Sequence, residues 1–291
     1  MDIAVLSDIH GNYEALKTCT QYALNKKINT FIFLGDYLGE LAFPQRTMEY
    51  LYQLKDSYNC TFVRGNKEDY WLKYRRGGEH GWKEKDSTTG SLYYTYYNLT
   101  NKDMDFFKQM EIAGIFSFDK MEAVAVCHGS PRVVNEKLLP GKPNTYEVMK
   151  QSRTRLILCG HTHVQGKVEY NGKSVINPGS VGVPLFSGGK AQFCILHEDG
   201  SQWKEELISL EYDVEKEIEN LYKAKLDEYA PYWCKTTVHL LRTGKYPHSQ
   251  ILDKAMELCK EEQGECKWPD IAEIYWKKAY ELYFGQEDLL I

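Results

Sequence analysis

The chain has 291 residues and a formal net charge of −5, with 43% hydrophobic and 26% charged residues. These values are ordinary for a globular protein with one large or two smaller domains, and they exclude a broad basic surface for nucleic acid. The N-terminal "MDIAVLSD" lacks a signal-peptide pattern, and no segment has the roughly 20 apolar residues of a membrane span. The eight cysteines are scattered, which favours free thiols, so we expect a cytoplasmic protein without membrane attachment.

The first 65 residues alternate between short apolar runs and segments with helical spacing. This pattern predicts strands at 3–7, 30–35 and 60–65 and helices at 12–24 and 44–55. Because short apolar strands between helices are covered on both faces, we expect a layered α/β fold. A polar, glycine-containing stretch at 75–100 then interrupts the core, and we expect an insertion there that serves as a lid or a rim loop.

Strand patterns dominate the next part of the chain. Strands separated by turns are expected at 113–118, 121–129, 155–161, 166–170, 173–180, 191–199 and 201–210. They predict two packed sheets flanked by helices. The pattern then becomes helical at 213–229, 231–244, 247–262 and 269–284, which divides the chain into a domain at 1–210 and a helical C-terminal extension at 211–291.

Metal-binding side chains recur where the apolar strands end. Most lie beside a glycine, and they are Asp8, His10, Asp36, Asn66, His128, His161 and His163. Strands of an α/β sheet deliver such groups to one edge, so we expect them to converge. Seven donors are more than one tetrahedral zinc site takes, and mixed imidazole and carboxylate ligands suit Mn, Fe, Zn, Co or Ni.

The series D-x-H, G-D, G-N, H-G and G-H-T-H, in this order, resembles the calcineurin-like metallophosphoesterase superfamily. "NPGSVGVP" at 177–184 further resembles its small bacterial and archaeal phosphodiesterase-like branch. The resemblance implies a four-layer α/β/β/α sandwich over about residues 1–210. It also implies two metal ions, one held by Asp8, His10, Asp36 and His163, the other by Asp36, Asn66, His128 and His161. Such an enzyme would hydrolyse a phosphoric ester or anhydride by attack of a metal-bridged hydroxide, with Asp36 bridging the ions.

One motif departs from the family pattern, because Gly65-Asn66-Lys67 stands where the family usually has G-N-H. We expect the catalytic residues to be Asp36, Asn66, His128 and Lys67. Lys67 would bind phosphate or donate a proton, the alternative being a solvated lysine that opens a helix. Loss of the histidine favours a leaving group that is already stable as an anion, such as that of a phosphoanhydride or an activated diester.

Two weaker substrate contacts are Asn12 and Arg132, for which a helix cap and a surface arginine are the alternatives. The tyrosines at 93–97 would stack a base at the rim or pack against the helical extension.

The substrate expected from these motifs is a phosphorylated small molecule, with a nucleotide favoured. "GNKED" and "LEYDVEKEI" resemble bacterial enzymes that hydrolyse diadenosine polyphosphates asymmetrically. The alternatives are a protein Ser/Thr phosphatase and a catalytically weak metal-binding module that binds a partner through its C-terminal helices.

Overall fold

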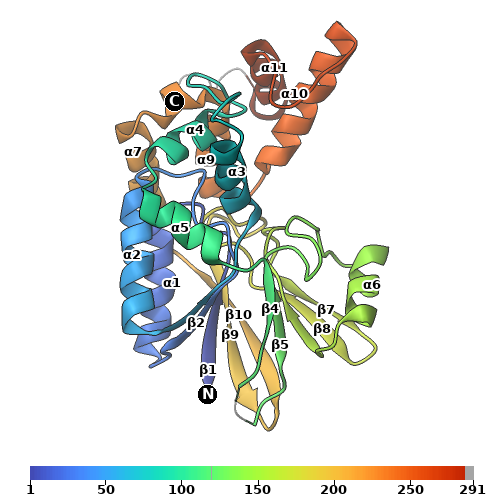
Figure 1. The fold of residues 1–291 in the computed structure, drawn as a ribbon. Coiled ribbons are helices and arrows are strands. Elements are labelled where there is room, and N and C mark those ends of the chain that lie inside the picture. The colour runs from blue at the N-terminus through green and yellow to red at the C-terminus, as the bar shows by residue number, and fades with distance from the viewer. Residues whose placement is uncertain (119, 286–291) are drawn as a thin grey trace.

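The structure, a computed structural model, describes residues 1–118 and 120–285. Two five-stranded sheets pack face to face, with α1 (Tyr13–Asn25) and α2 (Pro44–Ser57) outside the first sheet and α6 (Pro143–Gln151) outside the second (Figure 1). The predicted four-layer α/β/β/α sandwich is therefore confirmed.

Parallel strands form the centre of each sheet. The first sheet has the order β10-β9-β1-β2-β3, with bounds Gln202–Leu210, Ala191–Asp199, Asp2–Leu6, Thr30–Phe33 and Asn59–Phe62. The second has the order β4-β5-β6-β8-β7, with bounds Ala113–Phe116, Val124–Cys127, Leu156–Leu158, Lys173–Asn177 and Gly166–Tyr170. β1, β2 and β3 are parallel, as are β5, β6 and β8, so their carboxyl ends lie at one edge of each sheet.

The central strands are buried on both faces. In β1, Ile3 and Val5 point into the core between the sheets, whereas Ala4 and Leu6 face the layer of α1 and α2. β5 alternates in the same way, with Val124 and Val126 directed between the sheets. Such strands read as continuous apolar runs and can present polar groups only beyond their ends, which is where the predicted metal ligands stand.

The extension contains the helices α7 (Val214–Lys223), α8 (Leu226–Tyr229), α9 (Pro231–Thr243), α10 (His248–Gln263) and α11 (Glu273–Phe284). They lie above the edge to which the carboxyl ends of β1 and β2 point (Figure 1). The single helix expected at 213–229 is in fact two, because Lys225 adopts a left-handed backbone with φ of 59°. No helix of the described residues is long and apolar enough to span a membrane.

The structure has four helices whose bounds the sequence analysis did not predict. They are α3 (Asn66–Arg76), α4 (Gly90–Tyr97), α5 (Asn101–Gln109) and α6. The aromatic residues of α4 have modest intrinsic helix propensity, so its stability must come from tertiary packing. Tyr94 and Tyr96 are buried, and the Tyr94 ring packs 5.3 Å from that of Tyr229 in α8. Tyr94 thus packs against the helical extension, one of the two alternatives predicted, whereas Tyr96 packs against Tyr74 and Trp82.

A short segment of the 75–100 stretch holds the extension in place, and we call residues 86–88 the bracket. The Ser87 amide and hydroxyl donate to the two carboxylate oxygens of Glu273 at 2.6 and 2.8 Å. The Trp276 indole donates to the Thr88 hydroxyl at 2.9 Å, and the Asp86 amide donates to the Tyr229 carbonyl at 3.0 Å. These contacts tie α8 and α11 to the 75–100 stretch.

Replacement of Gly65 should destabilise the protein. A Cβ added there would lie 2.2 Å from Asp36 Oδ1 and 2.4 Å from the Asp36 amide nitrogen, so the backbone would have to shift. We expect Gly65→Ala to lower the free energy of unfolding by about 2 kcal/mol or more, measured by urea denaturation. Gly166→Ala is the matched control, because no described atom lies within 4 Å of its added Cβ. A Gly65→Ala protein as stable as the control would contradict this close approach.

Candidate metal centre

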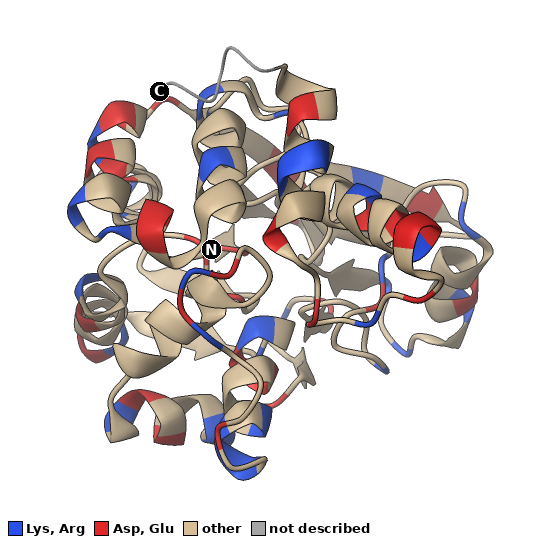
Figure 2. Cartoon of the chain, turned by 90° about the horizontal axis from the view of Figure 1, so that it is seen from above, with Lys and Arg blue, Asp and Glu red and all other residues tan. Residues whose placement is uncertain are grey.

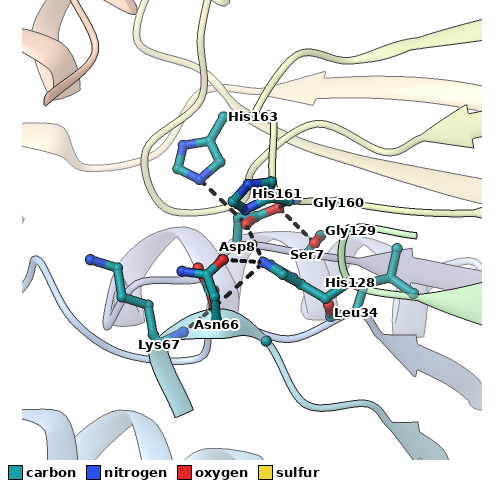
Figure 3. Close-up of polar contacts among 12 residues, drawn as sticks. Ser7, Asp8, Leu34, Asn66, Lys67, His128, Gly129, Gly160, His161 and His163 are labelled. Atoms are coloured by element: carbon teal, nitrogen blue, oxygen red, sulfur yellow. Dashed lines mark hydrogen bonds and ion pairs between the residues drawn. The ribbon is translucent and has the colours of Figure 1, made fainter. Parts of the chain in front are cut away.

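The predicted ligands meet at the edge of the sandwich that lies beneath the extension. Figure 3 shows Asp8, Asn66, His128, His161 and His163 directed toward a common centre, with His161 and His163 coming from one loop and Asn66 from the start of α3. Two groups of side chains have ligand atoms within 4.8 Å of one another, namely Asp8, His10 and His163, and Asp8, Asp36 and His128. Asp8 and His128 are fully buried and Asp36 is nearly so.

The backbone of this site is strained. Five of the seven predicted ligands have left-handed φ angles between 53° and 65°, namely Asp8, His10, Asp36, His161 and His163. Such conformations cost free energy in non-glycine residues and persist only where the surroundings enforce them. Backbone hydrogen bonds between the loops do so here: Asp8 N donates to Gly35 O at 3.1 Å, and Gly160 N to His128 O at 2.7 Å. These hydrogen bonds fix the positions of the loops that carry the predicted ligands.

Asp8 presents one oxygen that lacks a hydrogen-bond donor. Its Oδ2 accepts from the Ser7 hydroxyl at 2.6 Å and from the His161 amide at 3.0 Å. Its Oδ1 is buried without a hydrogen bond and lies 3.3 Å from His163 Nε2 and 3.8 Å from His10 Nε2. A buried carboxylate oxygen without a partner is costly, and a cation at the centre would satisfy it.

The histidine tautomers also fit a metal. His128 Nδ1 donates to the Leu34 carbonyl at 2.7 Å, and His163 Nδ1 donates to the Val183 carbonyl at 3.1 Å, because a carbonyl can only accept. If a metal ion displaced the Nε2 proton, each ring would direct its Nε2 lone pair to the centre, as metal-binding histidines do. His10 Nε2 and His163 Nε2 lie 3.1 Å apart, within hydrogen-bond distance of each other, and both nitrogens face the centre that a cation would occupy.

Asp36 lies between the two groups. Its Oδ1 accepts from the Lys67 amide at 2.8 Å and lies 3.5 Å from His128 Nε2, whereas its Oδ2 lies 3.9 Å from His10 Nε2. This is the position that a bridging carboxylate requires. Asn66 Oδ1 faces His128 Nε2 at 3.0 Å. The His161 ring centre is 5.3 Å from that of His128, although His161 belongs to neither group.

The buried charges shift one another's pKa. Burial alone would raise the pKa of Asp8, but His163, His128 and His10 hold it well below its usual range. Burial alone would lower the pKa of His128, but Asp36 and Asp8 raise it to about 10. Burial and the neighbouring His128 lower the pKa of His161 to about 4. The site thus concentrates negative charge for which protons and metal ions compete.

Glu68, which the sequence analysis did not single out, fixes the loop that carries Asp36. Its buried carboxylate accepts the backbone N–H groups of Asp36, Tyr37 and Gly65 at 3.0, 2.9 and 2.8 Å. Burial, followed by repulsion from Asp36, raises the pKa of Glu68 to about 7. The sequence signal was weak, because an acid near a helix start usually only caps the helix.

Glu40, also missed, links Lys67 to a predicted metal ligand. One carboxylate oxygen contacts His10 Nδ1 and the other accepts from Lys67 Nζ. The Lys67 side chain is only 12% exposed, so the solvated alternative is wrong. Burial alone would lower the pKa of Lys67, but Glu40 and Asp36 raise it, so the residue stays a cation.

The structure does not bring Asn12 or Arg132 to the site. Asn12 caps α1 by accepting from the Ala15 amide, and its Nδ2 donates to the Gly182 carbonyl and the Tyr212 hydroxyl, so the buried amide is fully used. The Arg132 guanidinium donates twice to Glu136, at 2.9 and 2.8 Å, and does not line the cavity beside the ligands. Both side chains are thus held by hydrogen bonds to other residues of the protein, which agrees with the alternatives of a helix cap for Asn12 and a surface arginine for Arg132.

A cavity of about 340 Å³ adjoins the predicted ligands. Its lining includes His10, Asp36, Asn66, His161 and His163 from the sandwich, together with Lys67. The extension adds Trp233, Leu240, Pro247, His248 and Ser249, none of which the sequence analysis proposed. Residues of the 75–100 stretch do not belong to the described lining.

Loss of the Glu40 charge should weaken metal binding. Glu40 contacts His10 Nδ1 and so fixes the orientation of the ring, and residues in this position contribute roughly 10- to 100-fold to metal affinity. We expect Glu40→Gln to lower Mn²⁺ affinity by roughly that factor, measured by competition with a fluorescent chelator. Glu136→Gln, which removes a carboxylate outside the cavity, is the control. Equal affinities in the two variants would contradict the role of Glu40.

The comparisons with known proteins agree with this geometry. An uncharacterised protein of Methanocaldococcus jannaschii is 29% identical over 253 residues, which cover 78% of this chain and 94% of the relative. A hypothetical protein from Pyrococcus horikoshii shares the fold with a TM-score of 0.71 and 22% identity, over 84% of this chain and 99% of that one. A metallophosphoesterase from Sphaerobacter thermophilus does so with a TM-score of 0.66 and 21% identity, over 84% of this chain and 100% of that one. Residues 1–201 match the calcineurin-like phosphoesterase superfamily domain, so the chain belongs to this superfamily of metal-dependent phosphoester hydrolases.

Proposed function

We propose that the protein is a dimetal phosphoesterase that cleaves a phosphodiester or phosphoanhydride bond of a small phosphorylated molecule. The observation that carries the proposal is the buried Asp8 Oδ1, which has no hydrogen bond and lies 3.3 to 3.9 Å from three imidazole nitrogens, with Asp36 close to His10 and His128. Asp8, His10, Asp36 and His163 would hold one ion, and Asp36, Asn66, His128 and His161 the other. The donor set suits Mn, Fe, Zn, Co or Ni.

Bound metal ions would supply Lewis acidity, which activates water and offsets the charge of the phosphoryl group. The chain's own contribution is placement and charge. Lys67 retains two N–H groups after its bond to Glu40, and its raised pKa keeps it protonated, so it acts as a point charge for a phosphate oxygen. A cation that holds its proton is a poor acid, which supports substrates whose leaving group needs little protonation.

Several observations support a small substrate, for which a dinucleoside polyphosphate is our finer proposal. Trp233 and His248 of the extension share the cavity with the predicted ligands, so a phosphoserine on a folded protein would have to pass them. Basic and acidic residues are interspersed on the ribbon seen from above, which offers a long polyanion no continuous basic track in that view (Figure 2).

The domain boundaries and the cellular location stay predictions. We propose a catalytic domain at 1–210 with an extension at 211–291, because α7 to α11 follow the last strand of the sandwich. The eight cysteines, all within the described part of the chain, are free thiols, which is compatible with a cytoplasmic location.

Hydrolysis of bis-p-nitrophenyl phosphate tests the proposed chemistry. With added Mn²⁺ we expect the wild-type protein to hydrolyse this substrate. Asp36→Asn and His128→Ala should each lower kcat/KM by roughly 100-fold or more, because they remove predicted metal ligands. Asp105→Asn and His197→Ala, outside the cavity, are matched controls. If no phosphoester showed metal-stimulated turnover, the interaction module would be the better interpretation.

The substrate class is tested with a dinucleoside tetraphosphate and a phosphoserine peptide. Without a histidine acid the alkoxide of serine is a poor leaving group, so we expect kcat/KM at least about tenfold higher for the anhydride. Phosphate release and nucleotide chromatography give the two rates. Comparable values would favour the protein phosphatase alternative.

A further inference from the structure

The helical extension contributes an aromatic wall to the catalytic cavity. Trp233 and His248 line it, and their rings stack with centres 4.3 Å apart and an interplanar angle of 21°. Leu240 and Pro247 of the extension and Leu185 of the sandwich add apolar surface. The family domain matches residues 1–201, so the wall lies mostly outside the part of the chain that defines the superfamily.

The wall carries no net charge. His248 is buried, its Nε2 hydrogen-bonds the Thr237 hydroxyl at 2.8 Å, and burial lowers its pKa to about 3, so the ring is neutral. Trp233 Nε1 is buried without a hydrogen-bond partner among the described residues. An indole N–H usually finds an acceptor when buried, so this donor remains available to one that a ligand supplies.

The cavity combines the predicted metal ligands, which suit a phosphoryl group, with the aromatic wall. Lys67 and Lys137 are the basic side chains in the described lining. Lys67 pairs with Glu40, and its Nζ lies 5.6 Å from the centre of the Trp233 ring, so this cation stands between the predicted ligands and the wall. Two lysines, one of them already paired, are few for several further phosphates, and the wall suits a flat group attached to the phosphoryl group.

Hydrogen bonds fix the wall relative to the predicted ligands. Leu185 N donates to the carbonyl of His163 at 3.0 Å, and the next residue, Phe186, donates through its backbone N to Gly244 O at 2.7 Å, just after α9. The bracket holds α8 and α11 from the other side. The wall is thus a built part of the cavity.

We propose, on the basis of the proposed function, that Trp233 and His248 form a subsite for one flat, weakly polar ring system carried by the substrate's phosphoryl group. The cavity of about 340 Å³ lies at the small end of ligand sites, so it takes one group of nucleoside size. A second ring system, as in a dinucleoside compound, would extend outside it.

Two substrates with the same scissile anhydride test the subsite in the Mn²⁺-loaded full-length protein. Uridine 5′-diphosphate and methyl diphosphate differ only in the group beyond the phosphates, so their kcat/KM ratio reports contacts with that group. We expect a wild-type ratio of about ten or more, which Trp233→Ala lowers by about tenfold. Trp268→Ala changes a half-exposed tryptophan of the extension outside the cavity and should preserve the ratio.

Ser249→Trp gives a second test that does not disturb the core. Ser249 is exposed at the start of α10 and lines the cavity, so a large side chain there should obstruct the ring and lower the ratio. Gln250→Trp, one residue further along the same helix and outside the lining, is the matched control. A wild-type ratio near one, or a parallel loss on both substrates in Trp233→Ala, would overturn the subsite and leave the proposed function standing.

Binding measurements separate the two proposals. Calorimetry compares uridine 5′-monophosphate with methyl phosphate, and we expect the nucleotide to bind at least about tenfold more tightly in wild type but not in Trp233→Ala. This result without hydrolysis of any phosphoester would keep the subsite and refute the enzymatic proposal. Equal affinities in both proteins would refute the subsite whatever the turnover.

Discussion

The burial of Asp8 and Asp36 among imidazole rings is the constraint on which the rest of the site depends. Two carboxylates in a nearly water-free position are unstable unless positive charge surrounds them. The imidazole rings provide this charge, because left-handed turns and backbone hydrogen bonds between the loops direct His10, His128 and His163 to the same centre. The glycines at 35 and 65 allow these loops to approach as closely as they do.

The packing of the two sheets brings the predicted metal ligands together. Neither sheet alone carries the whole set, because the first supplies the aspartates and Asn66 and the second supplies His128, His161 and His163. Packing of the sheets through a core that includes Val5, Ile32, Val126 and Leu158 aligns the two edges. The predicted metal site thus requires the sandwich as a unit, and the extension then adds residues to the lining of the cavity beside it.

The sequence allowed prediction of the sandwich and of the convergence of the ligands, because each ligand follows an apolar run that can only be a buried strand. Glu40 and Glu68 were not predicted, because the sequence does not show which residues an acidic side chain near a metal ligand contacts in the folded protein. Trp233 and His248 were missed for another reason: their place depends on how the extension folds back over the sheet edge. Asn12 was a candidate because it opens a helix, but its oxygen caps that helix and both of its N–H groups donate to residues distant in sequence, Gly182 and Tyr212.

The bracket makes the insertion and the extension dependent on each other. Ser87 and Thr88 meet α11 through hydrogen bonds, while Leu41 and Val183 of the sandwich share an apolar cluster with Leu221, Leu241 and other residues of the extension. A chain that ended at residue 210 would therefore expose the apolar side chains that now pack against the extension, next to the loops of the predicted metal site. Such a fragment would tend to self-associate. Insertion and extension thus form one packed unit despite their separation along the polypeptide.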